Sequence, residues 1–342
     1  MDKTSPRRRF RWTFILWLAV PILLWWVLRS IPLTAIFAAL KQLQLWQIAT
    51  LLLLNIAVML TFSGRWWFIL RGMGHSVSYL RLAAYRLAAF GVSYFTPGPQ
   101  FGGEPLQVYA VMHRHDVPGT TSAAAVALDK LLEMVVNFAF ISAGVIITLQ
   151  SPVLGGVLAR QAIVAALLLL ALPIGYLIAT WRGWHPLSWL LRRLPARIRA
   201  SKAYQRTLKS IAASEVQAST LIKQRPGSLV SALLISLLSW GGQMLEYWLS
   251  ARFLGLRLDM LQLVTIMTVA YAAFLSPLPG GLGALEAGQV WVFEALHLNP
   301  AAGLGMTLII RARDVLFGVA GLWLASMLLG NWRRVFKVSE TT

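Results

Sequence analysis

Long apolar runs alternate with short, mostly basic tracts over the whole chain. Six runs come close to or exceed the roughly 20 residues that a helix needs to cross a bilayer: 12–28, 46–70, 119–149, 160–181, 228–253 and 303–330. The first run follows a basic segment, but it contains Pro21 and lacks a clear small-x-small cleavage site, so we interpret it as an uncleaved helix. The pattern predicts an all-α polytopic membrane protein, with about six transmembrane helices in a single integral membrane domain over residues 1–342.

Two other apolar segments, 82–96 and 261–276, are too short to cross comfortably, and each runs into a stretch rich in proline and glycine. Irregular backbone persists at membrane depth only where protein or water covers its polar groups. We therefore predict two re-entrant helical hairpins. The turn residues are Pro97, Gly98, Gly102 and Gly103 in the first break, and Pro279, Gly280, Gly281 and Gly283 in the second.

The two breaks repeat one sequence template at an offset of 182 residues. Proline and glycine recur in many membrane proteins, but glutamate, glutamine and histidine align here as well, and this favours an internal repeat. The first repeat covers about 46–149 and the second about 228–330. The aligned identities are Pro97, Gly98, Glu104, Gln107, Val108, His115 and Pro118, matched by Pro279, Gly280, Glu286, Gln289, Val290, His297 and Pro300.

The composition also indicates a membrane protein. Of the 342 residues, 58% are hydrophobic and only 13% are charged, whereas a soluble domain carries about 25% charged residues. The net charge of +19 is concentrated in tracts beside the apolar runs. This distribution fits cytoplasmic loops and anionic lipid headgroups better than nucleic acid, so no nucleic-acid partner is expected. Cysteine is absent, which excludes disulfides and thiolate metal sites.

The basic tracts orient the chain, because cytoplasmic loops are enriched in lysine and arginine. The strongest tract covers 182–226, and others precede residue 12 and follow residue 330. All of them are cytoplasmic if both breaks are re-entrant, whereas reading either break as a crossing moves a basic tract outside. We therefore expect a bacterial inner-membrane protein with both termini and a basic loop at 182–226 in the cytoplasm. The repeats then have inverted topology, which is typical of a substrate site near the midplane.

Several charged residues fall within or beside the apolar segments, where an ionised side chain costs roughly 3 kcal/mol even on a lenient scale. In one interpretation, the cations among them hold a lipid phosphate while the carboxylates orient these cations or relay protons. In the other, the same groups form a structural network of ion pairs. The candidate substrate-binding residues are Glu104, Asp129, Lys130, Glu133, Glu286, Arg311, Arg313 and Asp314.

The two arginines of the last span should have different roles. Residues two apart on a helix point roughly 200° apart, so one of Arg311 and Arg313 should face the cavity while the other pairs with Asp314 or another acid. Glu286 follows the second break, where a carboxylate can also cap a helix. We expect Arg311, Arg313 and Glu286 to matter for transport more than for folding.

No catalytic site, metal site or cofactor is predicted. The five histidines are scattered or lie in a basic loop, and they lack carboxylates at metal-binding spacing. The chain contains no G-x-S-x-G, P-loop or H-E-x-x-H motif.

The two breaks and the charged spans resemble the lysylphosphatidylglycerol synthase transmembrane-region family, also described as flippase-like membrane proteins. The resemblance covers most of 10–330. It rests on the Pro-Gly-x5-Glu break at 97–104, the Asp-Lys-x-x-Glu pattern at 129–133, the Pro-x-Pro-Gly-Gly-x-Gly-x-x-Glu element at 277–286 and the charged cluster at 311–314. It implies a membrane domain that moves, or helps to move, a lipid between leaflets. We do not expect the aminoacyl-transfer domain of two-domain members, because the chain ends 12 residues after the last predicted span.

These observations favour a flippase-like transporter of an anionic phospholipid or lipid-linked intermediate, and not an enzyme. Two alternatives stay open. One is an accessory membrane subunit that binds a lipid or glycan biosynthetic enzyme through 182–226, and the other is a membrane-embedded enzyme acting on a lipid headgroup. The expected partner is a membrane phospholipid or a lipid-linked substrate, and assembly into a homo-oligomer is also open.

Overall fold

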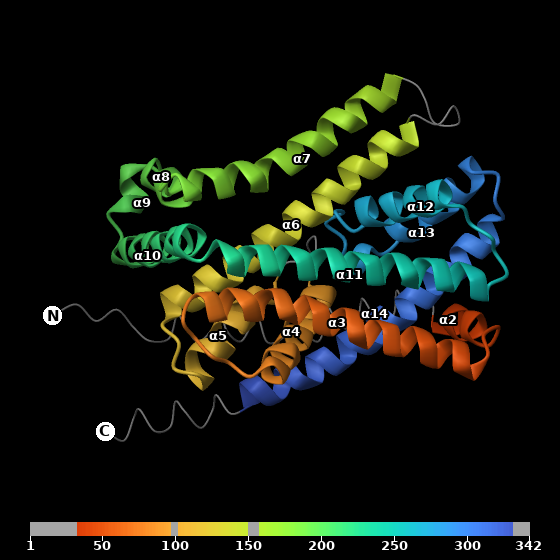
Figure 1. The fold of residues 1–342 in the computed structure, drawn as a ribbon, viewed down its shortest axis with the longest axis horizontal. Helices are drawn as coiled ribbons and strands as arrows, with labels where there is room; N and C mark the ends of the chain where they lie inside the picture. Colours follow the sequence, from red (N-terminus) through yellow and green to blue (C-terminus); the bar gives the residue numbers. More distant parts are fainter. Residues whose placement is uncertain (1–32, 97–101, 150–156, 331–342) are drawn as a thin grey trace.

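The computed structural model describes residues 33–96, 102–149 and 157–330, and helices make up the regular structure within these ranges (Figure 1). The predicted span 12–28, the turn residues Pro97 and Gly98, and the two terminal basic tracts lie outside the described residues. The helices are α2 (Leu33–Leu40), α3 (Leu45–Gly72), α4 (Tyr79–Phe95), α5 (Glu104–Arg114), α6 (Gly119–Leu149), α7 (Val157–Trp181), α8 (Pro186–Arg192), α9 (Ala196–Arg199), α10 (Lys202–Gln224), α11 (Pro226–Phe253), α12 (Met260–Ala273), the 3₁₀ turn η1 (Pro279–Gly281), α13 (Ala284–Ala295) and α14 (Pro300–Gly330).

Five of these helices, namely α3, α6, α7, α11 and α14, are long and apolar enough to cross a membrane. They correspond to five of the six predicted crossings, and the sixth is the undescribed run at 12–28. The outward faces of these helices are apolar, as the exposed Leu168 and Leu172 on α7 illustrate. In water such a surface would be unfavourable, whereas lipid tails accept it. The prediction of an all-α polytopic membrane protein is confirmed.

The order of helices repeats: α3, α4, α5 and α6 are followed, after α7–α10, by the similar series α11, α12, α13 and α14. The corresponding helices α3 and α11 lie side by side and run antiparallel (Figure 1). At one end of the pair the rings of Trp46 and Phe253 lie 5.3 Å apart. At the other end Gly72 contacts Ser228. Moreover, the last helix of each repeat packs against the other repeat: α14 packs on α4, and α6 packs on α12. Antiparallel equivalent helices are the relation that an inverted repeat requires.

The contact between α4 and α14 depends on small residues. A Cβ atom on Gly321 would lie 2.1 Å from the carbonyl oxygen of Leu87, and one on Gly91 would lie 2.5 Å from the backbone nitrogen of Leu322. Both positions therefore require glycine for the two backbones to touch. Close backbone approach through small residues is a common way to pack helices in membranes, where lipid weakens the hydrophobic drive for association.

Basic side chains gather at one end of the bundle. There the end of α3 meets α10 through Gly72 and Leu221, and the end of α5 meets the end of α14 through Arg114 and the carbonyl oxygen of Leu328. The strongly basic segment 182–226 belongs to the same end (Figure 1). The basic tracts within the described residues therefore lie at the same end of the bundle.

The segment predicted as a basic loop, 182–226, is itself helical and contains α8, α9 and α10. Its fold is organised by Glu215, which is buried in α10. The carboxylate of Glu215 accepts hydrogen bonds from the backbone nitrogens of Leu187 (2.8 Å) and Ser188 (3.1 Å) at the start of α8, and from the hydroxyl of Tyr176 on α7 (3.0 Å). A carboxylate at a helix N-terminus satisfies free N–H groups and opposes the helix dipole. Glu215 is visible in the sequence, but the sequence does not show that its side chain caps α8.

Candidate functional site

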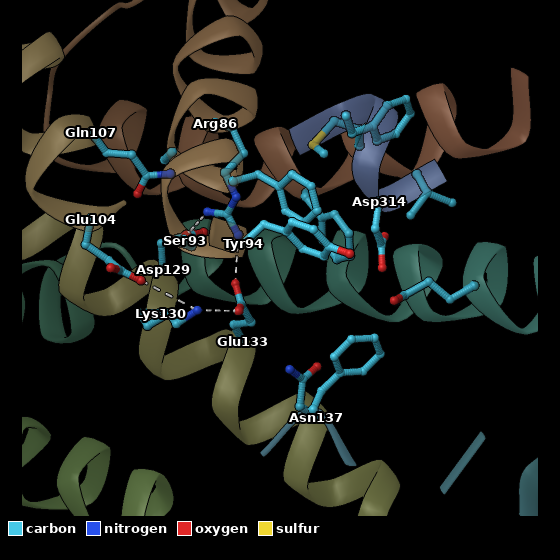
Figure 2. A pocket seen from close by; sticks show the side chains of 18 of the residues that line it. Arg86, Ser93, Tyr94, Glu104, Gln107, Asp129, Lys130, Glu133, Asn137 and Asp314 are labelled. Carbon is cyan, nitrogen blue, oxygen red and sulfur yellow. Dashed lines mark hydrogen bonds and ion pairs between the residues drawn. The ribbon is translucent and has the colours of Figure 1, made fainter. Parts of the chain in front are cut away.

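A cavity of about 170 Å³ lies between the two repeats (Figure 2). Helices α3, α4, α5 and α6 of the first repeat and α11, α12 and α14 of the second contribute to its wall. Aromatic rings of Phe62, Phe90, Tyr94, Tyr271, Phe274 and Phe317 form the less polar part. The charged part is lined by Arg86, Glu104, Asp129, Lys130, Glu133, Arg313 and Asp314. The lining is therefore amphipathic, although the cavity lies among membrane-spanning helices.

The first charged cluster lies where α3, α4 and α6 meet. Asp129 and Glu133 are one turn apart on α6 and project from the same face. Arg65 of α3 donates its Nε to Asp129 and its Nη2 to Glu133, at 2.7 Å in each case. Arg86 of α4 makes a second bridge to the same pair: Nη2 lies 2.7 Å from Glu133, and Nη1 contacts Asp129. Two guanidinium groups thus hold two carboxylates in a reciprocal arrangement, as the planar fork of arginine favours.

Lys130 and Glu104 extend this cluster towards the first break. The Nζ of Lys130 lies 2.7 Å from Glu133 and 3.6 Å from Glu104. Dashed lines mark both contacts in Figure 2. Glu104 is in the first turn of α5, where its side chain also accepts a hydrogen bond from the backbone nitrogen of Gly102 (2.8 Å). The carboxylate of Glu104 therefore both holds the backbone of the first break, just before α5, and pairs with a cavity-lining cation.

The second charged cluster joins α3, α11 and α14. Arg313 donates its Nε to Asp314 (2.9 Å), and its Nη2 lies 2.7 Å from the same carboxylate. Its Nη1 contacts Glu246 of α11 and donates to the side-chain oxygen of Asn55 (3.1 Å). Asn55 in turn donates to Glu246 (3.0 Å). Arg313, Asp314 and Asn55 line the cavity, and Glu246 lies directly behind them.

Arg311 has a different position. It is 0% exposed and does not line the cavity. Its Nε and Nη2 bind the two oxygens of Glu286 at 2.7 and 3.0 Å. Nη2 also donates to the carbonyl oxygen of Gly281 (3.0 Å), and Nη1 donates to that of Gly280. The hydroxyl of Tyr94 lies 3.4 Å from Nη1. We call this set the Arg311 latch, because it ties the second break to α14 and to α4 of the other repeat.

The backbone at the latch requires glycine. Gly280 has a φ of 54°, in the left-handed region that side chains disfavour. A Cβ atom there would also lie 2.8 Å from the ring of Tyr94. The break therefore turns tightly enough to aim two successive carbonyl oxygens at one guanidinium.

Of the eight residues predicted to bind substrate, six line the cavity: Glu104, Asp129, Lys130, Glu133, Arg313 and Asp314. Arg311 and Glu286 do not. The described turn residues lie around the breaks: Gly103 precedes α5, Pro279, Gly280 and Gly281 form η1, and Gly283 precedes α13 and donates its N–H to Glu286 (2.8 Å). Gly102 donates to Glu104.

The sequence analysis missed Arg65 and Arg86, which complete the first cluster. Each interrupts an apolar stretch, at 46–70 and 82–96, and a guanidinium in such a stretch needs a buried acid. Such an arginine therefore predicts a buried ion pair. Arg65, however, directly precedes Trp66 and Trp67, and this sequence context is also typical of the membrane interface. Within the described part of the chain, no group of three His, Asp or Glu side chains is arranged to hold a metal ion.

Comparison with known proteins places this architecture in a family. The family model "Lysylphosphatidylglycerol synthase TM region" matches residues 14–321. A UPF0104 membrane protein from Pyrococcus horikoshii is 25% identical over 323 residues, a match covering 91% of this chain and 92% of the relative. No solved structure matches.

Proposed function

The chain belongs to the lysylphosphatidylglycerol synthase transmembrane-region family, and from this premise we propose that it is a transporter that moves an anionic phospholipid or lipid-linked intermediate between leaflets. The observation that carries the proposal is the amphipathic cavity between two antiparallel repeats. Charged groups within membrane-spanning helices are costly and are retained mainly where they bind substrates or ions. An inverted repeat with broken helices provides such a site and a way to expose it alternately to the two sides.

The lining suits a molecule with a polar head and an apolar body. Lys130 and Arg313, from different repeats, supply cationic donors for a phosphate. Aromatic side chains such as Phe62, Phe90 and Phe317 offer apolar contact for the part of the lipid next to its headgroup. A cavity of about 170 Å³ is too small for a whole lipid, so the acyl chains stay in the membrane while the headgroup crosses.

A leaflet-exchange assay tests the proposal. The purified protein is reconstituted into liposomes that contain a trace of fluorescent phosphatidylglycerol, and a membrane-impermeant quencher reports the fraction in the outer leaflet. The wild-type protein should accelerate exchange over protein-free liposomes. Arg313→Lys keeps the charge but loses the fork, and should slow exchange several-fold. The matched control is Arg206→Lys on the exposed surface of α10, which should exchange at the wild-type rate. Exchange at the protein-free rate across a panel of anionic phospholipids and lipid-linked phosphates would refute the transporter.

One observation favours a second role, that of an accessory subunit for a biosynthetic enzyme. The segment 182–226 is folded through Glu215 and exposes basic side chains together with Trp184 and Trp189. Arg193 stacks over Trp189 at 3.7 Å. A folded and exposed surface of this kind suits a partner or the membrane surface. Because basic segments favour the inner side, we assign this end of the bundle to the cytoplasm of a bacterial inner-membrane protein.

A further inference from the structure

The first charged cluster is electrically balanced. Three cations, Arg65, Arg86 and Lys130, face three carboxylates on α5 and α6, and every one of the six groups contacts at least one of opposite sign. Glu104 lies in the first turn of α5, where the helix dipole favours a carboxylate, and it accepts a hydrogen bond from the backbone nitrogen of Gly102 just before the helix. In this half of the protein no extra ion is needed to compensate the buried charges.

The second charged cluster is not balanced. Arg313 is the only cation of this group, and it faces two carboxylates, Glu246 and Asp314. The side chains of these acids are only 2% and 7% exposed. Asn55 contributes hydrogen bonds but no charge. With both acids ionised, the group would carry one buried negative charge in excess.

Among the described residues, the neighbouring helices do not supply the missing positive charge. On α14, Arg311 is neutralised by Glu286 of α13 through the latch. Within 33–96, 102–149 and 157–330, the remaining titratable groups that face the cluster are tyrosines: Tyr247 on α11, Tyr271 on α12 and Tyr94 on α4. The neutral phenol form of these side chains adds no charge. Helix α3 contributes only Asn55 to this group.

Like charges that share a buried site cannot both remain ionised without a large cost, and one of them takes up a proton. We propose that Glu246, Arg313 and Asp314 form a site for one exchangeable proton, and that this proton makes Arg313 available to the phosphate of the lipid headgroup. This inference rests on the proposed transport function and adds a coupling ion to it.

The hydrogen bonds indicate where the proton binds. Both oxygens of Glu246 accept, one from Asn55 and one from Arg313. Asp314 accepts both contacts from Arg313 through Oδ1, and among the described residues no group donates to its Oδ2. Asp314 lines the cavity, where Figure 2 shows its carboxylate well apart from the group formed by Glu104, Lys130 and Glu133. Oδ2 of Asp314 is therefore the accessible position.

Protonation at Oδ2 changes what Arg313 can bind. In the unprotonated site each guanidinium nitrogen of Arg313 is directed at Asp314, Glu246 or Asn55. A proton on Asp314 removes one of the two charges that hold the guanidinium, and an incoming phosphate can replace the weakened contacts. Proton and headgroup then bind together and leave together. The reaction is a proton-coupled symport in which no covalent bond other than the O–H bond forms or breaks.

Binding and proton uptake can be measured on the purified full-length protein in detergent. The probe is dihexanoylphosphatidylglycerol, a water-soluble anionic phospholipid, added in weak buffer with a pH indicator. The wild-type protein should take up close to one proton per lipid bound, and its affinity should rise by up to tenfold per unit fall in pH within the titrating range. Asp314→Asn should bind the probe with little proton uptake and with an affinity that does not vary with pH. Glu246→Gln serves as the second variant and should also reduce the pH dependence.

His115 provides the control for titration elsewhere. It lies between α5 and α6, and burial together with Arg81 and Arg114 lowers the pKa of its imidazole below the usual value. His115→Gln should keep the wild-type pH dependence. Wild-type binding without proton uptake, or an Asp314→Asn variant with unchanged pH dependence, overturns the proton site but leaves the transport proposal intact. If the wild-type protein neither binds the probe nor exchanges lipid, the transport proposal fails and the proton site fails with it.

Discussion

Removal of the Arg311 side chain should strongly destabilise the protein. Arg311 is completely buried and all three of its guanidinium nitrogens donate hydrogen bonds. Arg311→Ala leaves the carboxylate of Glu286 without its cation and two carbonyl oxygens in the second break without their donor. Breaking a buried ion pair costs about 3–5 kcal/mol. Since the side chain of Glu286 is 22% exposed and can be partly hydrated, we expect a loss of about 3–4 kcal/mol in the free energy of unfolding.

A conservative change separates the charge from the geometry. Arg311→Lys keeps the cation, and an ammonium can reach Glu286, but it cannot also bind the carbonyl oxygens of Gly280 and Gly281. One or two buried acceptors are then unpaired, at about 1–3 kcal/mol each. Reversible unfolding in mixed micelles of increasing denaturing detergent gives the free energies. Arg206→Ala on the exposed face of α10 is the control and should unfold like the wild-type protein.

Two results would contradict this assignment. The first is an Arg311→Ala variant as stable as Arg206→Ala, which would mean that the latch contributes nothing to the fold. The second is an Arg311→Lys variant with wild-type stability but no lipid exchange. That outcome would return Arg311 to the substrate-binding role expected from the sequence.

Three further predictions concern the helix packing, the orientation of the chain and the folding of 182–226. Gly321→Ala places a methyl group against the carbonyl oxygen of Leu87 and should cost about 1–3 kcal/mol in the same unfolding assay, whereas Gly241→Ala on α11, where a Cβ meets no atom within 4 Å, should be nearly neutral. Gln205→Cys should react with an impermeant maleimide only from the cytoplasmic side, and Lys41→Cys only from the other side; labelling of position 205 from outside contradicts the topology. Glu215→Gln weakens the cap of α8 and should raise the rate of tryptic cleavage within 182–226 several-fold in inside-out vesicles, while an unchanged rate would show that the cap is dispensable.

The sequence was sufficient to predict the architecture because its main determinants are local. A run of about 20 apolar residues has few alternatives to a membrane-spanning helix. Proline and glycine at 277–283 interrupt such a run whatever the surroundings. What the sequence could not show was that 182–226 folds. That segment has few apolar residues in a row, and its order depends on the contact of Glu215 with a helix start about 27 residues away.

The candidate site was predictable only in part, because the pairing of charges depends on how helices are rotated against one another. The opposite directions of Arg311 and Arg313 on α14 followed from helix geometry, but the choice of the cavity-facing residue did not. Helix α14 is apolar over most of its surface, so no polar stripe marks the side that faces the protein. Arg65 could be matched with Asp129 only once the packing of α3 against α6 was known.

The difference between the two repeats bears most directly on mechanism. Arg65 of α3 and Glu246 of α11 occupy nearly equivalent positions, since they are separated by almost the repeat offset. One is a cation that holds acids of α6, and the other is an acid that holds a cation of α14. The two repeats thus share an inverted scaffold but carry charges of opposite sign at this position. As a result the first charged cluster is balanced, whereas the second lacks one positive charge. A symmetric scaffold can present its site equally to both sides, and an asymmetric set of charges within it can bind a proton in only one half. Alternating access and ion coupling would then be separable properties of this fold, the first residing in the paired helices and the second in Asp314 and its neighbours.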